Sequence, residues 1–360
     1  MFKINIRLLS RVDILIFDQL LKIDLKKKIH YFKQEIYLVY LFKSLIFCLF
    51  ALKFDNFFKN VKYYYYYYFY KALNPKIAIG NEIDLRIFEF KKMFSEKIAI
   101  AFQMSLYRSE YRFLTYKRLK KYKIDYFLTY DKWHTRYFNF FNTNFIEAGS
   151  VKANNNQFDS NLKKIKEYDI MFISSYRKKS QIDPISYYYL SSNLSSVNNY
   201  IAFKKISEFA KKNKKKLVVA LASNRKEKKK DFSKFDEINY FKSINNNFFY
   251  ENKNSFEIAD KSNLIISNDS TLGVELLYLG HKVLFLNSFS FLGSTHLFEN
   301  KKQDGPIWIS NSHLLGLEKK INKLLKNNNI QYEKTLEREK IKKYYDYNNT
   351  KLKKIIEKYV

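Results

Sequence analysis

The sequence contains one cysteine, Cys48, among 360 residues, so an intramolecular disulfide bond is excluded. Cys48 lies within an apolar run, where we expect a buried thiol. Disulfides mark oxidising compartments, and a chain without them is compatible with a reducing one.

Long apolar runs are also missing. The most apolar stretch is Ser44–Leu52, bounded by Lys43 and Lys53, and it has about half the length needed to span a bilayer. Residues 1–11 lack a long apolar core and residues 12–17 are too few, so we expect no signal peptide. We predict that Ser44–Leu52 forms a buried helix, with a helix lying in a membrane interface as the alternative.

Several motifs of cofactor and metal sites are absent from the sequence. There is no HExxH, no pair of CxxC motifs and no clustered His/Asp spacing, so no metal site is predicted. Neither GxGxxG nor GxxxxGK[ST] occurs, which argues against a standard dinucleotide site and against a P-loop. We therefore predict no cofactor.

Acidic residues are few. The chain has 35 Asp and Glu against 66 Lys and Arg, a net charge of +31. The lysines are spread along the chain and no nucleic-acid-binding motif accompanies them, so we predict no specific nucleic-acid partner. The charge still attracts anionic partners, including a membrane surface.

The residues that are present predict a folded α/β chain with two domains. Apolar runs and helical spacing alternate along it, which is typical of doubly wound parallel sheets. The expected strands are 13–17, 35–40, 76–79, 97–102, 124–129, 145–146, 169–173, 217–221, 248–250, 263–266 and 283–286. The expected helices are 41–53, 56–73, 84–93, one from 131, 200–213, 235–242, 255–259, 272–279 and most of 312–360. Within the second of these, residues 63–70 (YYYYYYFY) either pack beneath a neighbouring element or rest on lipid headgroups.

The polar, Asn-rich stretch 152–161 interrupts the pattern and is the best linker candidate. We therefore predict an N-terminal Rossmann-like domain at 1–151, a linker at 152–165, a second Rossmann-like domain at 166–311 and terminal helices at 312–360. Two such domains in tandem suggest a cleft between them.

One stretch of the second domain organises the functional prediction. Strand 263–266 leads through the polar turn Ser267–Thr271 into helix 272–279, which stops at Gly280, and strand 283–286 follows. This is a βαβ unit, whose loop lies at the carboxyl edge of the sheet, where open α/β folds bind ligands.

The turn in that unit can bind an anion. Ser270 and Thr271 lie where the first helical N–H groups and the helix dipole favour a phosphate, and Asn268 and Asp269 precede them. Glu275 lies one turn later and could accept hydrogen bonds from ribose hydroxyls. The alternative is that Asp269 or Ser270 only caps the helix.

Other polar residues follow strands of both domains. Asn81, Glu82 and Gln103 are expected on one edge of the first sheet, on the side of an acceptor substrate. Arg177 and Arg225 follow strands of the second domain and could bind a diphosphate. The alternative for both arginines is a solvated surface charge.

The run FEIADKSNLIISNDSTLGVELLYLGHKVLFLN resembles the nucleotide-sugar-binding segment of GT-B glycosyltransferases, of the kind seen in CDP-glycerol glycerophosphotransferases. More closely, the chain resembles bacterial O-antigen and surface-carbohydrate biosynthesis proteins. The segments that carry this resemblance are NPKIAIGNEID, IAIAFQMSLY, DYFLTYDKW, AGSVKANN, YDIMFISSYR and the terminal YDYN, in an order that covers the chain from about Val12 to its end.

The resemblance implies a GT-B-like fold with the nucleotide donor in the second domain and the acceptor in the first, commonly without a bound metal. Carried over by position, Ser270 and Thr271 match the phosphate-binding pair and Glu275 the acidic residue on the ribose side. Arg177 and Arg225 are the implied diphosphate partners.

The sequence departs from the glycerophosphotransferases at the catalytic base. Their first-domain histidine belongs to an HG pair, and this chain has Gln103–Met104 at the comparable strand end. Because glutamine cannot take a proton at neutral pH, we predict that Glu82 or another acid is the base, or that the chain is not catalytic. His134, His281 and His313 are the alternatives, of which the first two are expected to be structural.

The predicted function is transfer of a sugar or polyol phosphate from a nucleotide-activated donor to a lipid-linked intermediate of a surface polysaccharide. The enzyme is expected in the cytoplasm, with peripheral binding to the inner face of the plasma membrane. The alternatives are a nucleotide-sugar epimerase of the same architecture and a non-catalytic assembly protein.

Overall fold

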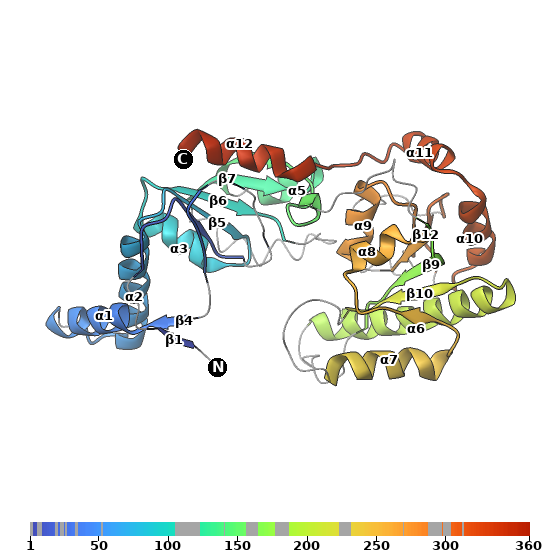
Figure 1. Cartoon of the computed structure of the whole chain (residues 1–360), viewed down its shortest axis with the longest axis horizontal. Coiled ribbons are helices and arrows are strands. Elements are labelled where there is room, and N and C mark those ends of the chain that lie inside the picture. The colour runs from blue at the N-terminus through green and yellow to red at the C-terminus, as the bar shows by residue number, and fades with distance from the viewer. Residues whose placement is uncertain are drawn as a thin grey trace. The chain divides into compact units, whose positions relative to one another are not determined.

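The chain forms two compact units, shown in Figure 1. Unit 1 is built from residues 1–105, 113–155 and 346–360, and unit 2 from residues 106–112 and 156–345. The computed structural model describes the chain apart from residues 1–2, 6–8, 19–20, 22–24, 26, 33–34, 52, 105–122, 140, 156–164, 177–186, 223–231, 269, 287–296, 298–303 and 312.

Unit 1 contains a sheet of six parallel strands in the order β3-β2-β5-β6-β7-β8. Their bounds are β2 Ile14–Ile16, β3 Ile29–Tyr31, β5 Ile77–Asn81, β6 Ile98–Phe102, β7 Lys123–Thr129 and β8 Asn142–Glu147. The short strands β1 (Lys3–Asn5) and β4 (Glu35–Tyr37) pair separately. The strands β2 and β6 are apolar along their length because a parallel sheet is covered on both faces.

Helices cover the two faces of this sheet. Among the described residues, the helices of unit 1 are α1 Leu38–Phe50, α2 Phe57–Leu73, α3 Leu85–Met93, α5 Lys132–Phe138 and α12 Thr350–Tyr359. Ile77 and Ile79 of β5 pack in a cluster with Leu352 and Ile356 of α12. The alternate position Gly80 faces α3, because a Cβ built there would lie 3.2 Å from Cβ of Ile87. The period-2 alternation of a strand therefore assigns one face to α12 and the other to α3.

The C-terminal segment joins unit 1 through a buried polar cluster. This cluster connects two 3-10 turns, η2 (Ala153–Asn155) and η7 (Tyr347–Asn349). Asn154 Nδ2 donates to Ala148 O at 2.8 Å and to Asn349 Oδ1 at 2.9 Å. The first residues of the expected linker, Lys152, Ala153 and Asn154, thus belong to unit 1, and Ala153 and Asn154 are buried there.

Unit 2 repeats the architecture with a sheet of six parallel strands in the order β11-β10-β9-β12-β13-β14. Their bounds are β9 Tyr168–Ile173, β10 Leu217–Ala220, β11 Phe249–Tyr250, β12 Ser262–Ser267, β13 Val283–Leu286 and β14 Trp308–Ile309. The helices are α6 Tyr187–Lys212, α7 Phe232–Ile244, α8 Ser255–Asp260, α9 Thr271–Tyr278, α10 Leu317–Lys326 and α11 Asn329–Arg338. The doubly wound α/β class predicted from the sequence is confirmed in both units.

Helix α6 differs from the prediction because it begins at Tyr187, well before the expected start at Tyr200. The added part is rich in Ser and Asn, which have low intrinsic helix propensity, so the sequence pattern resembles a loop. Among the described residues, no helix is both long enough and apolar enough to cross a bilayer.

Candidate functional site

Each unit has one place where its strand order reverses, and open α/β sheets bind ligands at the carboxyl ends of the strands there. In unit 1 this place lies between β2 and β5, because β3 is on the far side of β2 and β6 on the far side of β5. In unit 2 it lies between β9 and β12, with β10 beyond β9 and β13 beyond β12. The candidate site residues are therefore sought at these two edges.

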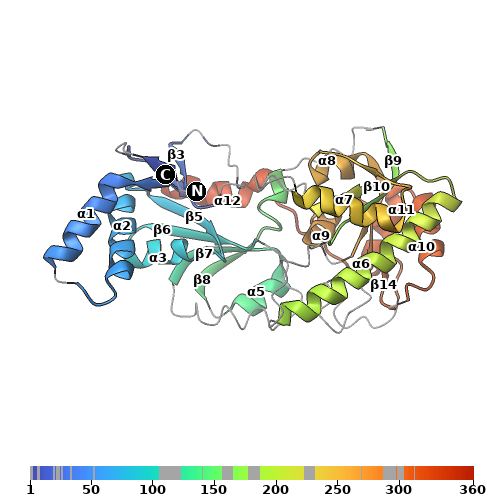
Figure 2. The same ribbon diagram turned by 90° about the horizontal axis from the view of Figure 1, so that it is seen from below.

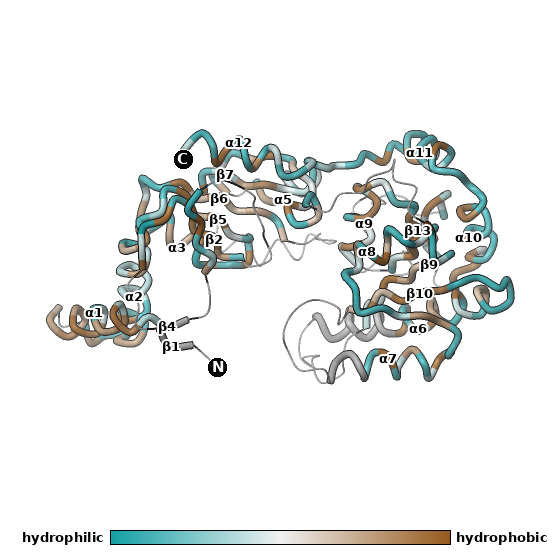
Figure 3. The backbone as a smooth tube through the Cα atoms, viewed as in Figure 1, coloured by the Kyte–Doolittle hydropathy of each residue, from teal (hydrophilic) through white to brown (hydrophobic). Residues whose placement is uncertain are grey.

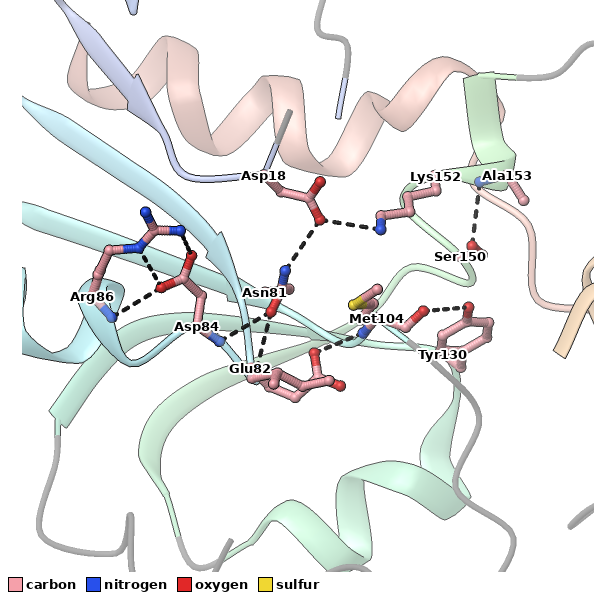
Figure 4. A network of polar contacts seen from close by, with 11 residues as sticks. Asp18, Asn81, Glu82, Asp84, Arg86, Met104, Tyr130, Ser150, Lys152 and Ala153 are labelled. Atoms are coloured by element: carbon pink, nitrogen blue, oxygen red, sulfur yellow. Dashed lines mark hydrogen bonds and ion pairs between the residues drawn. The ribbon is translucent and has the colours of Figure 1, made fainter. Parts of the chain in front are cut away.

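At the edge of unit 1, Asp18 follows β2 and lies beside Asn81, the last residue of β5 (Figure 4). Asn81 Nδ2 donates to Asp18 Oδ2 at 3.1 Å. Asn81 Oδ1 accepts the backbone N–H groups of Ile83 and Asp84, both at 3.0 Å. The turn after β5 thus orients the Asn81 amide toward Asp18.

Lys152 completes this polar group from the segment after β8. Its Nζ lies 3.1 Å from Asp18 Oδ2, and the Asp18 side chain is only 7% exposed. Ser150 Oγ accepts the Ala153 N–H at 3.2 Å and shapes the turn that carries Lys152. The Asp18–Asn81–Lys152 group joins three segments distant in sequence. Asp18 and Lys152 could not be predicted as site residues because neither belongs to a local sequence motif.

Glu82 and Gln103 lie at the same edge but are turned into the protein. Glu82 is 0% exposed, and its Oε2 accepts the Met104 N–H at 2.7 Å. Gln103 Oε1 accepts the Tyr130 N–H at 3.1 Å, which links the ends of β6 and β7. Three predicted residues, Asn81, Glu82 and Gln103, are thus brought to one edge, where Glu82 and Gln103 also hold the turns that follow the strands.

Two of the candidate histidines, His134 and His281, are buried and have structural contacts, whereas His313 is exposed. His134 is fully buried in α5, with Nδ1 2.8 Å from Asp131 Oδ1, and the same oxygen accepts the His134 N–H at 3.0 Å. His281 is 4% exposed, and its Nε2 lies 3.5 Å from Asp260 Oδ1. Over the described part of the chain, no three His, Cys, Asp or Glu side chains gather into a group that could hold a metal ion.

At the edge of unit 2, α9 begins directly after β12. Ser270 is its N-cap residue, and its Oγ accepts the Leu272 N–H at 3.3 Å. Thr271 occupies the first helical turn and is half-buried, and Glu275 is half-buried one turn later. The capping interpretation of Ser270 is therefore correct, but a hydroxyl that accepts one hydrogen bond can still donate its own proton to a ligand oxygen.

A close approach between β12 and α9 places that helix start. A Cβ built on Gly273 would lie 2.1 Å from Ser267 Oγ and 2.4 Å from Ser267 Cβ, so only glycine fits. Ser267 is fully buried, and its Oγ has no hydrogen-bond partner among the described residues. The start of α9 is thus held directly over the end of β12.

The neighbouring strand β9 contributes a second ordered turn. Tyr176 N–H donates to Ser174 Oγ at 3.1 Å, and Ser175 N–H donates to Asn199 Oδ1 of α6 at 3.2 Å. Asn199 is fully buried, and Asn268 at the end of β12 is 2% exposed. Asn199 was missed from sequence because it lies in the part of α6 that was read as a loop. Asp269, Arg177 and Arg225, also predicted here, lie outside the described residues.

No curated protein sequence matches this chain significantly. Solved structures with two such units do resemble it. UDP-GlcNAc 2-epimerase from Neisseria meningitidis, bound to UDP-GlcNAc, has 12% sequence identity and a TM-score of 0.50 over 84% of this chain and 80% of that one. This likeness shows the fold, which is GT-B-like as expected from the sequence.

Two further structural neighbours have lower scores. UDP-N-acetylglucosamine 2-epimerase from Rickettsia bellii has 12% identity and a TM-score of 0.49, covering 100% of this chain and 97% of that one. The wall teichoic acid polymerase TagF has 12% identity and a TM-score of 0.46, covering 96% of this chain and 81% of that one.

A family model described as "putative O-antigen biosynthesis protein" matches residues 108–360. This match covers the whole of β7 and β8, residues 156–345 of unit 2 and the returning helix α12. The chain therefore belongs to this family of O-antigen biosynthesis proteins, as the resemblance in its sequence predicted.

Proposed function

We propose that this protein transfers a sugar or a polyol phosphate from a nucleotide-activated donor to a lipid-linked intermediate of O-antigen or a related surface polysaccharide. The observation that supports it best is the capped start of α9 at the strand-order reversal of unit 2, in a member of an O-antigen biosynthesis family. The reaction would take place in the cytoplasm, at the inner face of the plasma membrane.

The donor would bind with its diphosphate at the start of α9. The positive end of the helix dipole stabilises an anion there, and the hydroxyls of Ser270 and Thr271 can donate to phosphate oxygens. Glu275, one turn further along the helix, would accept from the ribose hydroxyls. Asn268, which is buried at the end of β12, would border the same site, with Asp269, Arg177 and Arg225 as further proposed contacts.

The acceptor hydroxyl would be activated in unit 1, where we propose Glu82 as the base. Its carboxylate is fully buried and accepts the Met104 N–H, and we propose that the acceptor hydroxyl approaches it beside the Gln103–Met104 turn. Asn81 and Gln103 would line the acceptor side. Asp18 is another carboxylate at this edge, and it hydrogen-bonds Asn81.

The experiment is incubation of the purified protein with a panel of nucleotide sugars and CDP-polyols, with and without a lipid-linked acceptor. Release of free nucleotide only in the presence of acceptor supports transfer. An altered sugar formed without acceptor would mean epimerisation, and donor binding without turnover would mean a non-catalytic assembly protein. Either of these two results rejects the proposal.

A further inference from the structure

Helix α1 presents an apolar face to solvent. It projects from unit 1 on the far side of α2 from the sheet (Figures 1 and 2), and it is hydrophobic along its length (Figure 3). We define the α1 face as the exposed large apolar side chains of α1, of the segment that follows it and of the first turn of α2. Their exposed fractions are 60% for Phe42, 52% for Ile46, 51% for Leu49, 86% for Phe50, 58% for Phe54 and 87% for Phe58.

The four members of the α1 face that belong to α1 lie on one side of that helix. Residues spaced by three or four positions share a face, and Phe42, Ile46, Leu49 and Phe50 follow this spacing. The opposite side carries the buried residues of the helix, which are Tyr40, Ser44 and Cys48. Only one side of the predicted buried helix is therefore buried, and the exposed side carries four large apolar side chains together with Lys43.

The α1 face is held in place by α2. Phe47 of α1 packs on Tyr64 of α2 with ring centroids 4.3 Å apart. Lys53 Nζ lies 4.9 Å from the centroid of the same Tyr64 ring and donates to its hydroxyl. The large exposed side chains thus stand on a preformed support, so binding would cost little ordering of the backbone.

The charged residues of α1, of α2 and of the segment between them are almost all lysines. Residues 38–73 contain five lysines and one acid, Asp55, which gives 5 − 1 = +4. All five lysines are exposed, and they are Lys43, Lys53, Lys59, Lys62 and Lys71. An apolar face with a basic surround is the pattern of a helix that lies in the headgroup region of an anionic bilayer.

We propose that the α1 face docks unit 1 on an anionic lipid bilayer, with its aromatic and aliphatic side chains among the acyl chains and the five lysines at the headgroups. A second copy of the chain is disfavoured as the partner of the α1 face, because two copies of residues 38–73 would meet, each with a net charge of +4, and repel each other. At 13 residues, α1 is about 20 Å long, so it lies in the interface and does not cross the bilayer. The tyrosines of α2 that border it have the apolar body and polar tip suited to that boundary.

This inference deepens the proposed function by naming the surface at which a lipid-linked acceptor is met. It rests on the proposed function only for the biological role of membrane docking. Vesicle binding itself requires neither donor nor turnover, so it can be tested separately. The test is sedimentation of the full chain, without nucleotide, with vesicles of phosphatidylglycerol and phosphatidylcholine or of phosphatidylcholine alone, at low and high salt.

We expect binding to the anionic vesicles at low salt and a loss of at least about tenfold in partitioning for Phe50→Glu/Phe58→Glu. The matched control is Leu315→Glu/Ile330→Glu, which makes the same charge change at side chains of unit 2 that are 66% and 68% exposed, and it should bind as the parent does. Lys59→Gln/Lys62→Gln should weaken binding mainly at low salt.

Three results would overturn the proposal. The first is parent protein that stays in the supernatant at low salt, and the second is an equal loss of vesicle binding in the two Glu variants. The third is a parent protein that binds no vesicles and forms a dimer, which the Phe50→Glu/Phe58→Glu substitutions dissociate. Turnover is measured separately with a water-soluble acceptor. Vesicle binding by a protein that turns over no donor would reject the transferase function and leave the docking surface standing.

Discussion

The side-chain amide of Asn154 donates to Asn349 Oδ1 at 2.9 Å, across 195 residues of chain. Asn349 Nδ2 in turn donates to Val151 O at 2.8 Å and to Asn155 Oδ1 at 3.0 Å. Asn349 adopts a left-handed backbone conformation with φ 53°, which asparagine tolerates better than most residues. This buried side chain is therefore one of the contacts that hold the last helix to the rest of unit 1, beside the apolar packing of Leu352 and Ile356.

Asn349→Gly should lower the free energy of unfolding of unit 1 by about 1–3 kcal/mol, because glycine keeps the backbone conformation but leaves buried partners unpaired. Hydrogen exchange in α12 should become faster. The control is Asn348→Gly, at an exposed neighbour with the same φ of 53°, which should not destabilise the protein. Equal stability of the two variants would show that the cluster does not hold α12.

Gly273→Ala should destabilise unit 2 by about 1–3 kcal/mol, since the added methyl group overlaps Ser267. The second variant is Gly273→Ala/Ser267→Gly, which removes both overlapping Ser267 atoms and should recover part of the loss. Ser267→Ala in the same background should recover less, because Cβ of Ser267 is itself 2.4 Å from the added group. Chemical denaturation of all four proteins measures this, and a fully stable Gly273→Ala would contradict the close approach.

Thr271→Ala should weaken binding of CDP- and UDP-activated donors. A lost hydroxyl contact to a charged phosphate is worth about 1.5–3 kcal/mol, or roughly ten- to hundredfold in Kd. Thr271→Ser keeps the hydroxyl and should bind as the parent does in isothermal calorimetry. Adding Ser270→Ala should weaken binding further and also remove about 1 kcal/mol of helix capping, so stability is measured alongside. Parent-like donor affinity in the double variant would mean that the site is elsewhere.

Glu82→Gln should reduce kcat by about 10²–10⁴ with little change in donor affinity, if Glu82 removes the acceptor proton. Glutamine keeps an oxygen for the Met104 N–H, so the turn is expected to survive. Asp18→Asn is the comparison at the same edge, and it should change acceptor KM more than kcat because it weakens the Lys152 ion pair. The reverse pattern, with turnover lost in Asp18→Asn and kept in Glu82→Gln, would assign proton removal to Asp18.

Tyr168 and Glu251 form a pair that should make stability depend on pH. The pKa of Tyr168 is raised from 10.0 to about 12. The larger cause is burial, and the second is the 2.6 Å hydrogen bond that its hydroxyl donates to Glu251. Burial alone would raise the pKa of the Glu251 carboxyl, but the hydrogen bonds from Tyr168 and Lys253 lower it below its usual 4.5.

Because the pKa of Tyr168 is higher in the folded state, its contribution is fully present below pH 10 and is lost as the pH rises toward about 12. The stability advantage of the parent over Tyr168→Phe should therefore narrow through that window. At the acid end the lowered pKa of Glu251 contributes stability above 4.5, which is lost as the pH falls through its folded value. Denaturant titrations at a series of pH values measure the free energy of unfolding at the acid and the alkaline end. The control is Tyr347→Phe, which changes an exposed tyrosine. An advantage that stays constant into the alkaline range would contradict the pairing.

The sequence by itself determined the local architecture. In the stretch 262–286, buried apolar strands, a capping serine and a glycine stop define β12, α9 and β13 within two residues of their observed bounds. Such elements can be predicted because periodicity and capping are properties of neighbouring residues. The same reasoning placed Asn81, Glu82 and Gln103 on one edge, since parallel strands end on the same side of their sheet.

Only the tertiary structure decided which distant segments meet and which faces they leave exposed. Asp18, Asn81 and Lys152 converge although 134 residues separate the first from the last (152 − 18 = 134), and their pairing depends on the strand order. The apolar run around Cys48 predicted burial, but α2 covers one side only and leaves Phe50 at the surface. The local pattern of a segment shows which of its side chains are apolar enough to be buried. Which element covers that segment is decided by contacts between residues far apart in the sequence, and these contacts leave no periodic pattern in the sequence.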